Sequence, residues 1–180
     1  MSNDVIRNRS FGKQDNSIEK QIWVILEQIS DPELPVLSIV DLGIVREVRL
    51  QSEPILGNPA LGIVITPTYS GCPAMDIIIK NIEAVLQEHG FNQVKVTTVL
   101  SPAWTTDWMT KDGKQKLKAY GIAPPVGKSI TPQYLEDLEV ECPQCHSKNT
   151  HLVSQFGSTA CKALFKCDDC KEPFDYFKCH

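Results

Sequence analysis

The sequence predicts an α+β fold: a small two-layer α/β sandwich followed by a compact C-terminal ribbon that a metal ion holds together. Two observations support this prediction. Helical and β-type hydrophobic patterns alternate over roughly the first 120 residues, and six of the seven cysteines lie in the last 40. The two parts of the chain therefore have different sources of stability.

Helix and strand patterns begin after a polar N-terminal stretch. Isoleucines recur at helical spacing over residues 18–29, so we expect an amphipathic helix that begins at Asn16 and stops before Pro32. Residues 44–50 and 61–65 are rich in β-type side chains and flank a segment of Pro, Gly and Asn. This pattern predicts a hairpin.

The second half of the sandwich is predicted from the same helical and β-type patterns. Apolar residues share one helical stripe over residues 74–89, and Gly90 supplies a stop signal. Alternation over residues 93–100 predicts a strand that packs on this helix, and a shorter helix should follow Asp107 and end near Tyr120. Helix, hairpin, helix, strand and helix together describe a two-layer α+β domain.

The composition of the chain excludes several classes of function. The chain has 180 residues, of which 42% are hydrophobic and 22% charged, so it should fold. With a net charge of -4, the chain as a whole lacks the positive charge that attracts nucleic acid or an anionic membrane surface. No apolar run is long enough to span a bilayer, and the first residues contain no signal sequence. We therefore expect a cytoplasmic protein with reduced thiols.

The chain divides into four segments on these grounds. We expect a flexible tail at residues 1–15, an α+β domain at 16–121, a linker at 122–140 and a zinc ribbon at 141–180. The linker is rich in proline and offers few obvious apolar contacts. The sequence leaves open whether the chain forms a homo-oligomer.

The ribbon contains two Cys-x-x-Cys pairs with 21 residues between them, Cys142 with Cys145 and Cys167 with Cys170. Two such pairs complete a tetrahedral four-thiolate shell, and zinc is the favoured ion. The ion would supply much of the folding free energy of so short a segment, which favours a structural site and a docking function over catalysis. Four thiolates also suit a single iron or an iron–sulfur cluster, and the further candidate ligands are Cys161, Cys179 and His180.

Cys72 is the one cysteine outside this tail, between a predicted strand and the best-defined helix. Because Pro73 suits the first helical turn, we expect Cys72 at the N-cap. The helix dipole would there lower the pKa of the thiol and favour a nucleophilic or metal-binding thiolate. A capping thiol without chemistry is the equal alternative. No neighbouring histidine or base pattern makes it a hydrolase nucleophile.

Two further groups of residues are unusual. The carboxylates of Asp31, Glu33 and Asp41 lie in a proline-constrained loop and could act as acid and base, but such residues more often cap turns. Trp104 and Trp108 could present a binding surface, and we expect them to pack in the core instead.

Four short motifs together resemble the small α+β domain of the SufT type, which occurs in iron–sulfur protein assembly factors. They are Asp-Pro-Glu at 31–33, Asp-Leu-Gly at 41–43, Thr-Pro-Thr-Tyr-Ser-Gly-Cys-Pro at 66–73 and Pro-Ala-Trp-Thr-Thr-Asp-Trp-Met at 102–109. The resemblance implies that Cys72 is a candidate reactive thiol that binds iron or an iron–sulfur cluster transiently. The residues it implies as a supporting site are Asp31, Glu33, Asp41 and Thr66.

Two sequence segments of the C-terminal tail, residues 156–164 and 172–179, make the resemblance more specific. With them, residues 17–180 are similar to the PaaD family, also called PaaJ, of phenylacetate degradation. The resemblance implies a non-catalytic accessory protein of phenylacetyl-CoA epoxidase. Its expected partners are components of that oxygenase, above all the reductase, which carries flavin and a [2Fe-2S] cluster. A structural subunit that handles no metal is the alternative.

Overall fold

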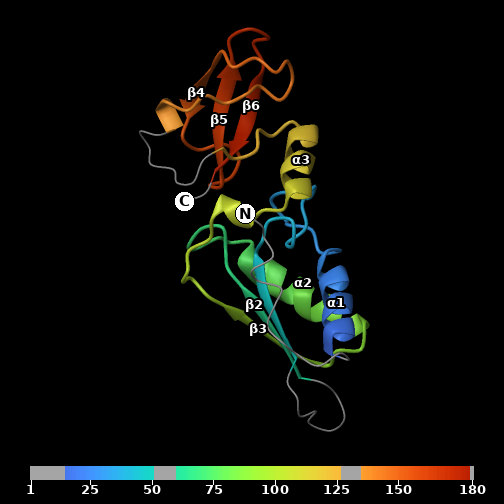
Figure 1. Cartoon of the computed structure of the whole chain (residues 1–180). Helices are drawn as coiled ribbons and strands as arrows, with labels where there is room; N and C mark the ends of the chain where they lie inside the picture. Colours follow the sequence, from blue (N-terminus) through green and yellow to red (C-terminus); the bar gives the residue numbers. More distant parts are fainter. Residues whose placement is uncertain (1–14, 51–59, 127–134, 179–180) are drawn as a thin grey trace.

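The computed structural model describes residues 15–50, 60–126 and 135–178, and it confirms an α+β fold (Figure 1). The expected flexible tail therefore lies almost wholly outside the described residues, as do Cys179 and His180. No helix in the described part is long and apolar enough to cross a membrane. The N-terminal elements are α1 (Asp15–Leu26), β1 (Val45–Leu50), β2 (Ala60–Ile65), α2 (Met75–Glu88), β3 (Gln93–Thr98) and α3 (Lys111–Tyr120). The C-terminal elements are β4 (Thr150–Ser154), β5 (Lys162–Cys167) and β6 (Pro173–Phe177).

The first sheet has the strand order β1-β2-β3. β1 and β2 pair antiparallel, which confirms the predicted hairpin, and β2 and β3 pair parallel with Ile63 opposite Val96. A parallel pair needs a crossover connection, which α2 provides. α1 and α2 lie on one side of this sheet (Figure 1). Their apolar faces and the inner face of the sheet form the core of the sandwich.

The helix boundaries agree with the predictions except at both ends of α1 and at the start of α2. α1 includes Asp15, one residue before the expected N-cap, and it ends at Leu26 although the isoleucine pattern continues to Ile29. The chain leaves the helix because the Ile29 carbonyl accepts a hydrogen bond from the amide of Ile39 and the amide of Asp31 donates to the carbonyl of Leu37. Ile29 still faces the core, with 4% of its surface exposed. The loop, rather than a longer helix, buries it.

The second sheet is the antiparallel ribbon β4-β5-β6. Phe165 on β5 stacks on Phe174 and meets the edge of Tyr176, with ring centroids 6.0 and 5.6 Å apart. The expectation of few apolar contacts in the proline-rich segment was wrong, because its residues Ala123, Leu135 and Val140 are buried in this ribbon core. The division into four segments stays a prediction.

The ribbon is also docked on the sandwich. Phe177 is fully buried in the sandwich core, and its ring meets that of Trp104 edge-on at a centroid distance of 6.0 Å. Ala123 pairs with the end of β6: its amide donates to the carbonyl of Asp175, and its carbonyl accepts from the amide of Phe177. In Figure 1 the ribbon stands at one end of the sandwich, beside α3. These contacts form a junction that joins the core of the ribbon to the core of the sandwich.

Candidate metal centre and candidate thiol site

The four cysteines predicted as metal ligands lie together at one end of the ribbon. The Sγ atoms of Cys142, Cys145, Cys167 and Cys170 all lie within 4.8 Å of one another. Cys142 and Cys170 are 3.7 Å apart and Cys145 and Cys167 are 3.5 Å apart, measured between sulfurs. A tetrahedral ion with four thiolates at about 2.3 Å places its sulfurs roughly 3.8 Å apart. The donor set therefore fits a single tetrahedral ion.

The two knuckles that supply these sulfurs have the same construction. The amide of Cys142 donates to the carbonyl of Ser147, and the amide of Cys167 donates to that of Glu172, five residues on in each case. His146 and Lys171, which directly follow the second cysteine of each pair, have positive φ angles of 64° and 68°. This turn points backbone amides at the sulfurs, and the amide of Cys170 lowers the pKa of the Cys167 thiol to about 7.

Cys72 does not occupy the predicted N-cap. α2 begins at Met75 after an Ala74 cap without a side-chain hydrogen bond, so the sulfur precedes the helix by three residues. Residues 73–74 form a turn in which the amide of Met75 donates to the carbonyl of Cys72. The helix therefore starts later than Pro73 suggested.

The environment of the Cys72 thiol also differs from the expectation. Burial raises its pKa, and this effect exceeds the opposing hydrogen bonds from the amide of Ala74 and the hydroxyl of Tyr69. The predicted lowering by the helix dipole was wrong, because the half-buried sulfur lies outside the first turn. At neutral pH Cys72 is a protonated thiol with two donors at the sulfur. Such a group becomes a thiolate when a metal ion displaces its proton.

Two of the four supporting residues lie close to Cys72. Asp31 and Glu33 both act electrostatically on its thiol. The Oδ1 of Asp31 accepts hydrogen bonds from the amides of Glu33 (2.9 Å) and Leu34 (2.8 Å), which closes the proline turn. Burial raises the pKa of Asp31, against those two bonds. Asp31 thus shapes the loop that presents the half-buried Glu33.

Asp41 instead fixes the loop before β1 to the start of α3. Its carboxylate accepts hydrogen bonds from Lys116 (2.6 Å), Thr110 (2.9 Å) and the amide of Ser38 (3.1 Å). Burial alone would raise the pKa of Asp41, but these bonds outweigh it and the pKa is lowered. Each of these contacts is structural.

The remaining predicted residues have distinct surroundings. Thr66 is 1% exposed, and its hydroxyl has no hydrogen-bond partner among the described residues. Trp104 is buried as expected, and its indole N–H donates to the carbonyl of Leu42 at 2.9 Å. Trp108 is partly buried, with the Arg46 guanidinium 3.4 Å above its ring centroid.

Cys161 is not part of the four-cysteine cluster, although the sequence made it a candidate ligand. Its Sγ lies 3.0 Å from the hydroxyl oxygen of Thr159 and donates to the Oε2 of Glu33 at 3.5 Å. Burial raises its pKa to about 12. Its position beside the Cys72 loop has no signal in the sequence, because Cys161 and Glu33 are 128 residues apart.

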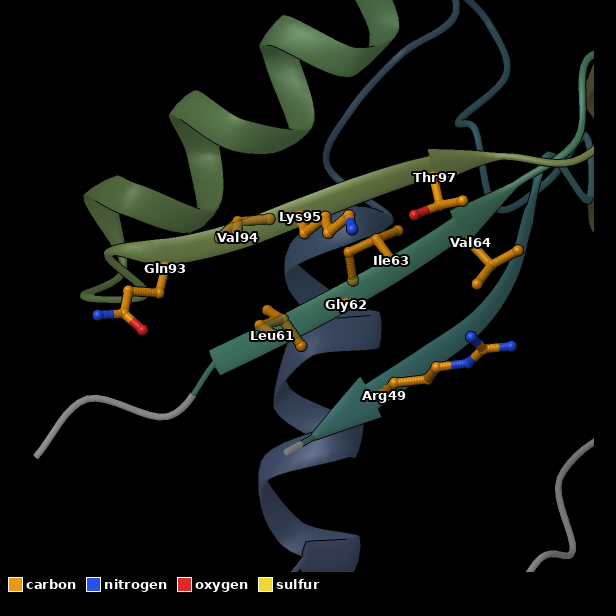
Figure 2. A pocket seen from close by; sticks show the side chains of 9 residues that line it. All are labelled: Arg49, Leu61, Gly62, Ile63, Val64, Gln93, Val94, Lys95 and Thr97. Carbon is orange, nitrogen blue, oxygen red and sulfur yellow. The ribbon is translucent and has the colours of Figure 1, made fainter. Parts of the chain in front are cut away.

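A separate hollow of about 420 Å³ lies on the sheet, lined by residues of β1, β2 and β3 (Figure 2). Arg49 and Lys95 are its charged members. The described residues of its lining include no cysteine, histidine or carboxylate.

Comparisons with known proteins match both parts of the chain. Residues 19–100 match a family described as iron-sulfur cluster assembly protein, and residues 128–178 match the PaaD zinc beta ribbon domain. A solved domain of unknown function DUF59 from Bacillus anthracis has 30% identity and a TM-score of 0.51, covering 57% of this chain and 92% of that one.

Two of the curated relatives match only about half of this chain, and a third matches most of it. The "Fe-S protein maturation auxiliary factor YitW" of Bacillus subtilis is 32% identical, covering 56% of this chain and 93% of its own length. The corresponding factor SufT of Staphylococcus aureus is 34% identical, with coverages of 48% and 92%. A protein of Escherichia coli K12, named as a putative subunit of 1,2-phenylacetyl-CoA epoxidase, is 52% identical, covering 88% of this chain and 92% of its own.

Fold and site together define a protein with an iron–sulfur assembly domain of the DUF59/SufT type and a C-terminal four-cysteine ribbon. The chain belongs to the PaaD family of proteins associated with phenylacetyl-CoA epoxidase.

Proposed function

We propose that the chain is a maturation factor of the phenylacetyl-CoA epoxidase system, with Cys72 as the thiol that transiently carries iron or an iron–sulfur cluster. The recipient in this proposal is the reductase, the component that holds a [2Fe-2S] cluster. The chain acts by binding and transfer in the cytoplasm, where thiols stay reduced, and it is not itself the oxygenase.

Two kinds of similarity support the pathway and the role. The 52% identical relative carries the name of an epoxidase subunit, which supports the pathway. Two relatives of the N-terminal part alone are named as auxiliary factors of iron–sulfur protein maturation, which supports the role. Cys72 lies inside the stretch that matches the assembly family.

The observation that carries the proposal is the arrangement of donors around the Cys72 sulfur. The thiol is half-buried and accepts hydrogen bonds from the amide of Ala74 and the hydroxyl of Tyr69. Donors of this kind stabilise the thiolate that forms when a metal ion replaces the proton. Burial limits the access of oxidants and keeps the uncharged sulfur protonated until the ion arrives.

The ribbon has a different role in this proposal. We assign one zinc ion to Cys142, Cys145, Cys167 and Cys170, because the sulfur spacing fits a closed tetrahedral shell without an open position. A closed shell stabilises the fold and catalyses nothing. The ribbon then serves to dock on the recipient.

The test is to produce the reductase together with a Cys72→Ala variant and to measure its iron and sulfide content. The proposal expects a folded variant, a reductase poor in cluster and an inactive oxygenase. Ser70→Ala is the matched control, because Ser70 is an exposed residue of the same loop. Full cluster occupancy with Cys72→Ala would refute the proposed role of this thiol.

The name of the 52% identical relative as a subunit also favours a second candidate function, a structural component of the oxygenase complex. That function expects stable co-purification with the oxygenase and full activity with Cys72→Ala. The same variant therefore separates the two candidates.

A further inference from the structure

The junction between sandwich and ribbon brings a second thiol to the Cys72 loop. The Sγ of Cys161, directly before β5, donates to the Oε2 of Glu33 at 3.5 Å. The charge of Glu33 affects both the Cys72 thiol and the Cys161 thiol. Cys161 also acts electrostatically on Tyr69, and the hydroxyl of Tyr69 donates a hydrogen bond to the Cys72 sulfur. Cys161 and Glu33 are therefore in contact across the junction, and the Cys72 thiol lies close enough to Glu33 for the two groups to interact electrostatically.

The surroundings of Cys161 resemble those of Cys72. Cys161 is 3% exposed, and the Thr159 hydroxyl lies 3.0 Å from its sulfur. Both cysteines are free thiols, each with a neighbouring hydroxyl group that can donate to the sulfur. Apolar packing does not require such donors, and a plain packing role for Cys161 leaves its hydrogen bond to a carboxylate unexplained.

We propose that Cys72, Cys161 and Glu33 form a second metal site across the junction, which takes a borderline-soft divalent ion such as Fe²⁺. The inference rests on the proposed function and adds the ribbon thiol to its carrier site. Two thiolates and one carboxylate oxygen match the ligand preferences of such an ion. On binding, each thiol releases its proton to solvent and no electron is transferred. Three protein ligands leave a coordination position open for a ligand of the recipient.

The ion would draw the three groups together. Among the described residues, only the four ribbon cysteines already have their ligand atoms within 4.8 Å of one another. Cys161 lies in the ribbon and Glu33 in the sandwich, so an ion held by both fastens the ribbon in its docked position. Undocking would remove Cys161 from the ion and favour its release. The ribbon thereby controls retention of the metal.

Cobalt provides the probe, because cobalt–thiolate bonds absorb light whereas zinc–thiolate bonds do not. The full chain, with its ribbon filled by zinc, is titrated with Co²⁺ without oxygen; zinc stays in the ribbon because such sites bind zinc more tightly than cobalt. The wild type should develop a charge-transfer band. Cys72→Ser and Cys161→Ser should each lose about half of its intensity, and each should bind Co²⁺ at least about tenfold more weakly.

Two variants separate ligand loss from damage to the junction. Glu33→Gln should keep the band, which reports sulfur ligands, and weaken Co²⁺ binding. Phe177→Leu disturbs the apolar contact with Trp104 at the same junction and removes no ligand, so its band should keep the wild-type shape. Zinc content and thermal unfolding establish that each variant is folded.

A measurement on the wild type covers the case in which Cys161→Ser does not fold. Prolonged alkylation without oxygen labels the buried Cys161 only when the junction opens, and Fe²⁺ should slow the labelling of Cys72 and Cys161 in parallel, as followed by mass spectrometry of the two peptides. Protection of Cys72 alone, or a Cys161→Ser variant that binds Co²⁺ like the wild type, would overturn the inference and leave the proposed function standing. No cobalt band in the wild type would overturn it as well, whereas the proposed function fails only if the reductase matures without Cys72.

Discussion

The Cys161 thiol of the ribbon and the Glu33 carboxylate of the sandwich form a hydrogen bond of 3.5 Å although 128 residues separate them. The same junction contains the edge-on contact between Trp104 and Phe177. Polar and apolar contacts thus connect the ribbon to the loop that carries Cys72. The stability of the sandwich should consequently depend on the ribbon.

Phe177→Ala should reduce the free energy of unfolding of the sandwich, although the residue belongs to the ribbon. Phe177 is fully buried in the sandwich core, and truncation of such a ring costs about 3–5 kcal/mol. Denaturant unfolding followed by tryptophan fluorescence measures the loss. Val153→Ala is the control, because Val153 is 52% exposed on the ribbon and should change stability by less than about 0.5 kcal/mol. Equal stability of the two variants would mean that the ribbon is not docked in solution.

Cys167→Ser should unfold the ribbon, because it removes one of the four ligands on which so small a segment depends. Limited proteolysis should cut first within the ribbon and the segment before it. The docked contacts at Phe177 and Cys161 are then lost, so the sandwich should survive with reduced thermal stability. Digestion of the whole chain at the same rate would indicate that sandwich and ribbon fold only as one unit.

Asp41→Asn should destabilise the fold near neutral pH by about 1 kcal/mol, because it removes the charge paired with a half-exposed Lys116. The folded-state pKa of Asp41 is lowered, so its contribution is present above the unfolded pKa and disappears as the pH falls through the folded pKa. Wild type and variant should therefore converge in acid below about pH 4. Urea unfolding across this range checks the sign, and a difference that grows in acid would contradict it.

Gly43→Ala should destabilise the protein more than Gly90→Ala does. Both glycines have positive φ, at 67° and 91°, which costs an alanine roughly 1 kcal/mol. A Cβ at residue 43 would also lie 2.3 Å from the carbonyl oxygen of Trp108, whereas one at residue 90 meets nothing within 4 Å. Comparison of the two unfolding free energies isolates the clash. Equal losses of unfolding free energy in the two variants would show that the 102–109 loop moves away from the new Cβ at no free-energy cost.

The sequence predicts most of the secondary structure and the ribbon ligands because these depend on local spacing. The Cys-x-x-Cys pairs and the apolar stripe of α2 are periodic features that a single chain reveals. The end of α1 and the start of α2 were misplaced because loop hydrogen bonds at Ile29 and the turn after Cys72 override the local pattern. The meeting of Cys161 with Glu33 depends on tertiary docking, which spacing does not encode.

Delivery of iron or a cluster to the reductase depends, in the function proposed above, on the Cys72 thiol. The most direct measurement loads the zinc-containing chain with iron and sulfide without oxygen, mixes it with reductase stripped of its cluster, and follows the [2Fe-2S] signal of the reductase by electron paramagnetic resonance after reduction. We predict that the wild type restores the cluster faster than the same concentrations of free iron and sulfide, and that Cys72→Ala gives no acceleration. A Cys72→Ala variant that accelerates restoration as much as the wild type would contradict this role of the thiol.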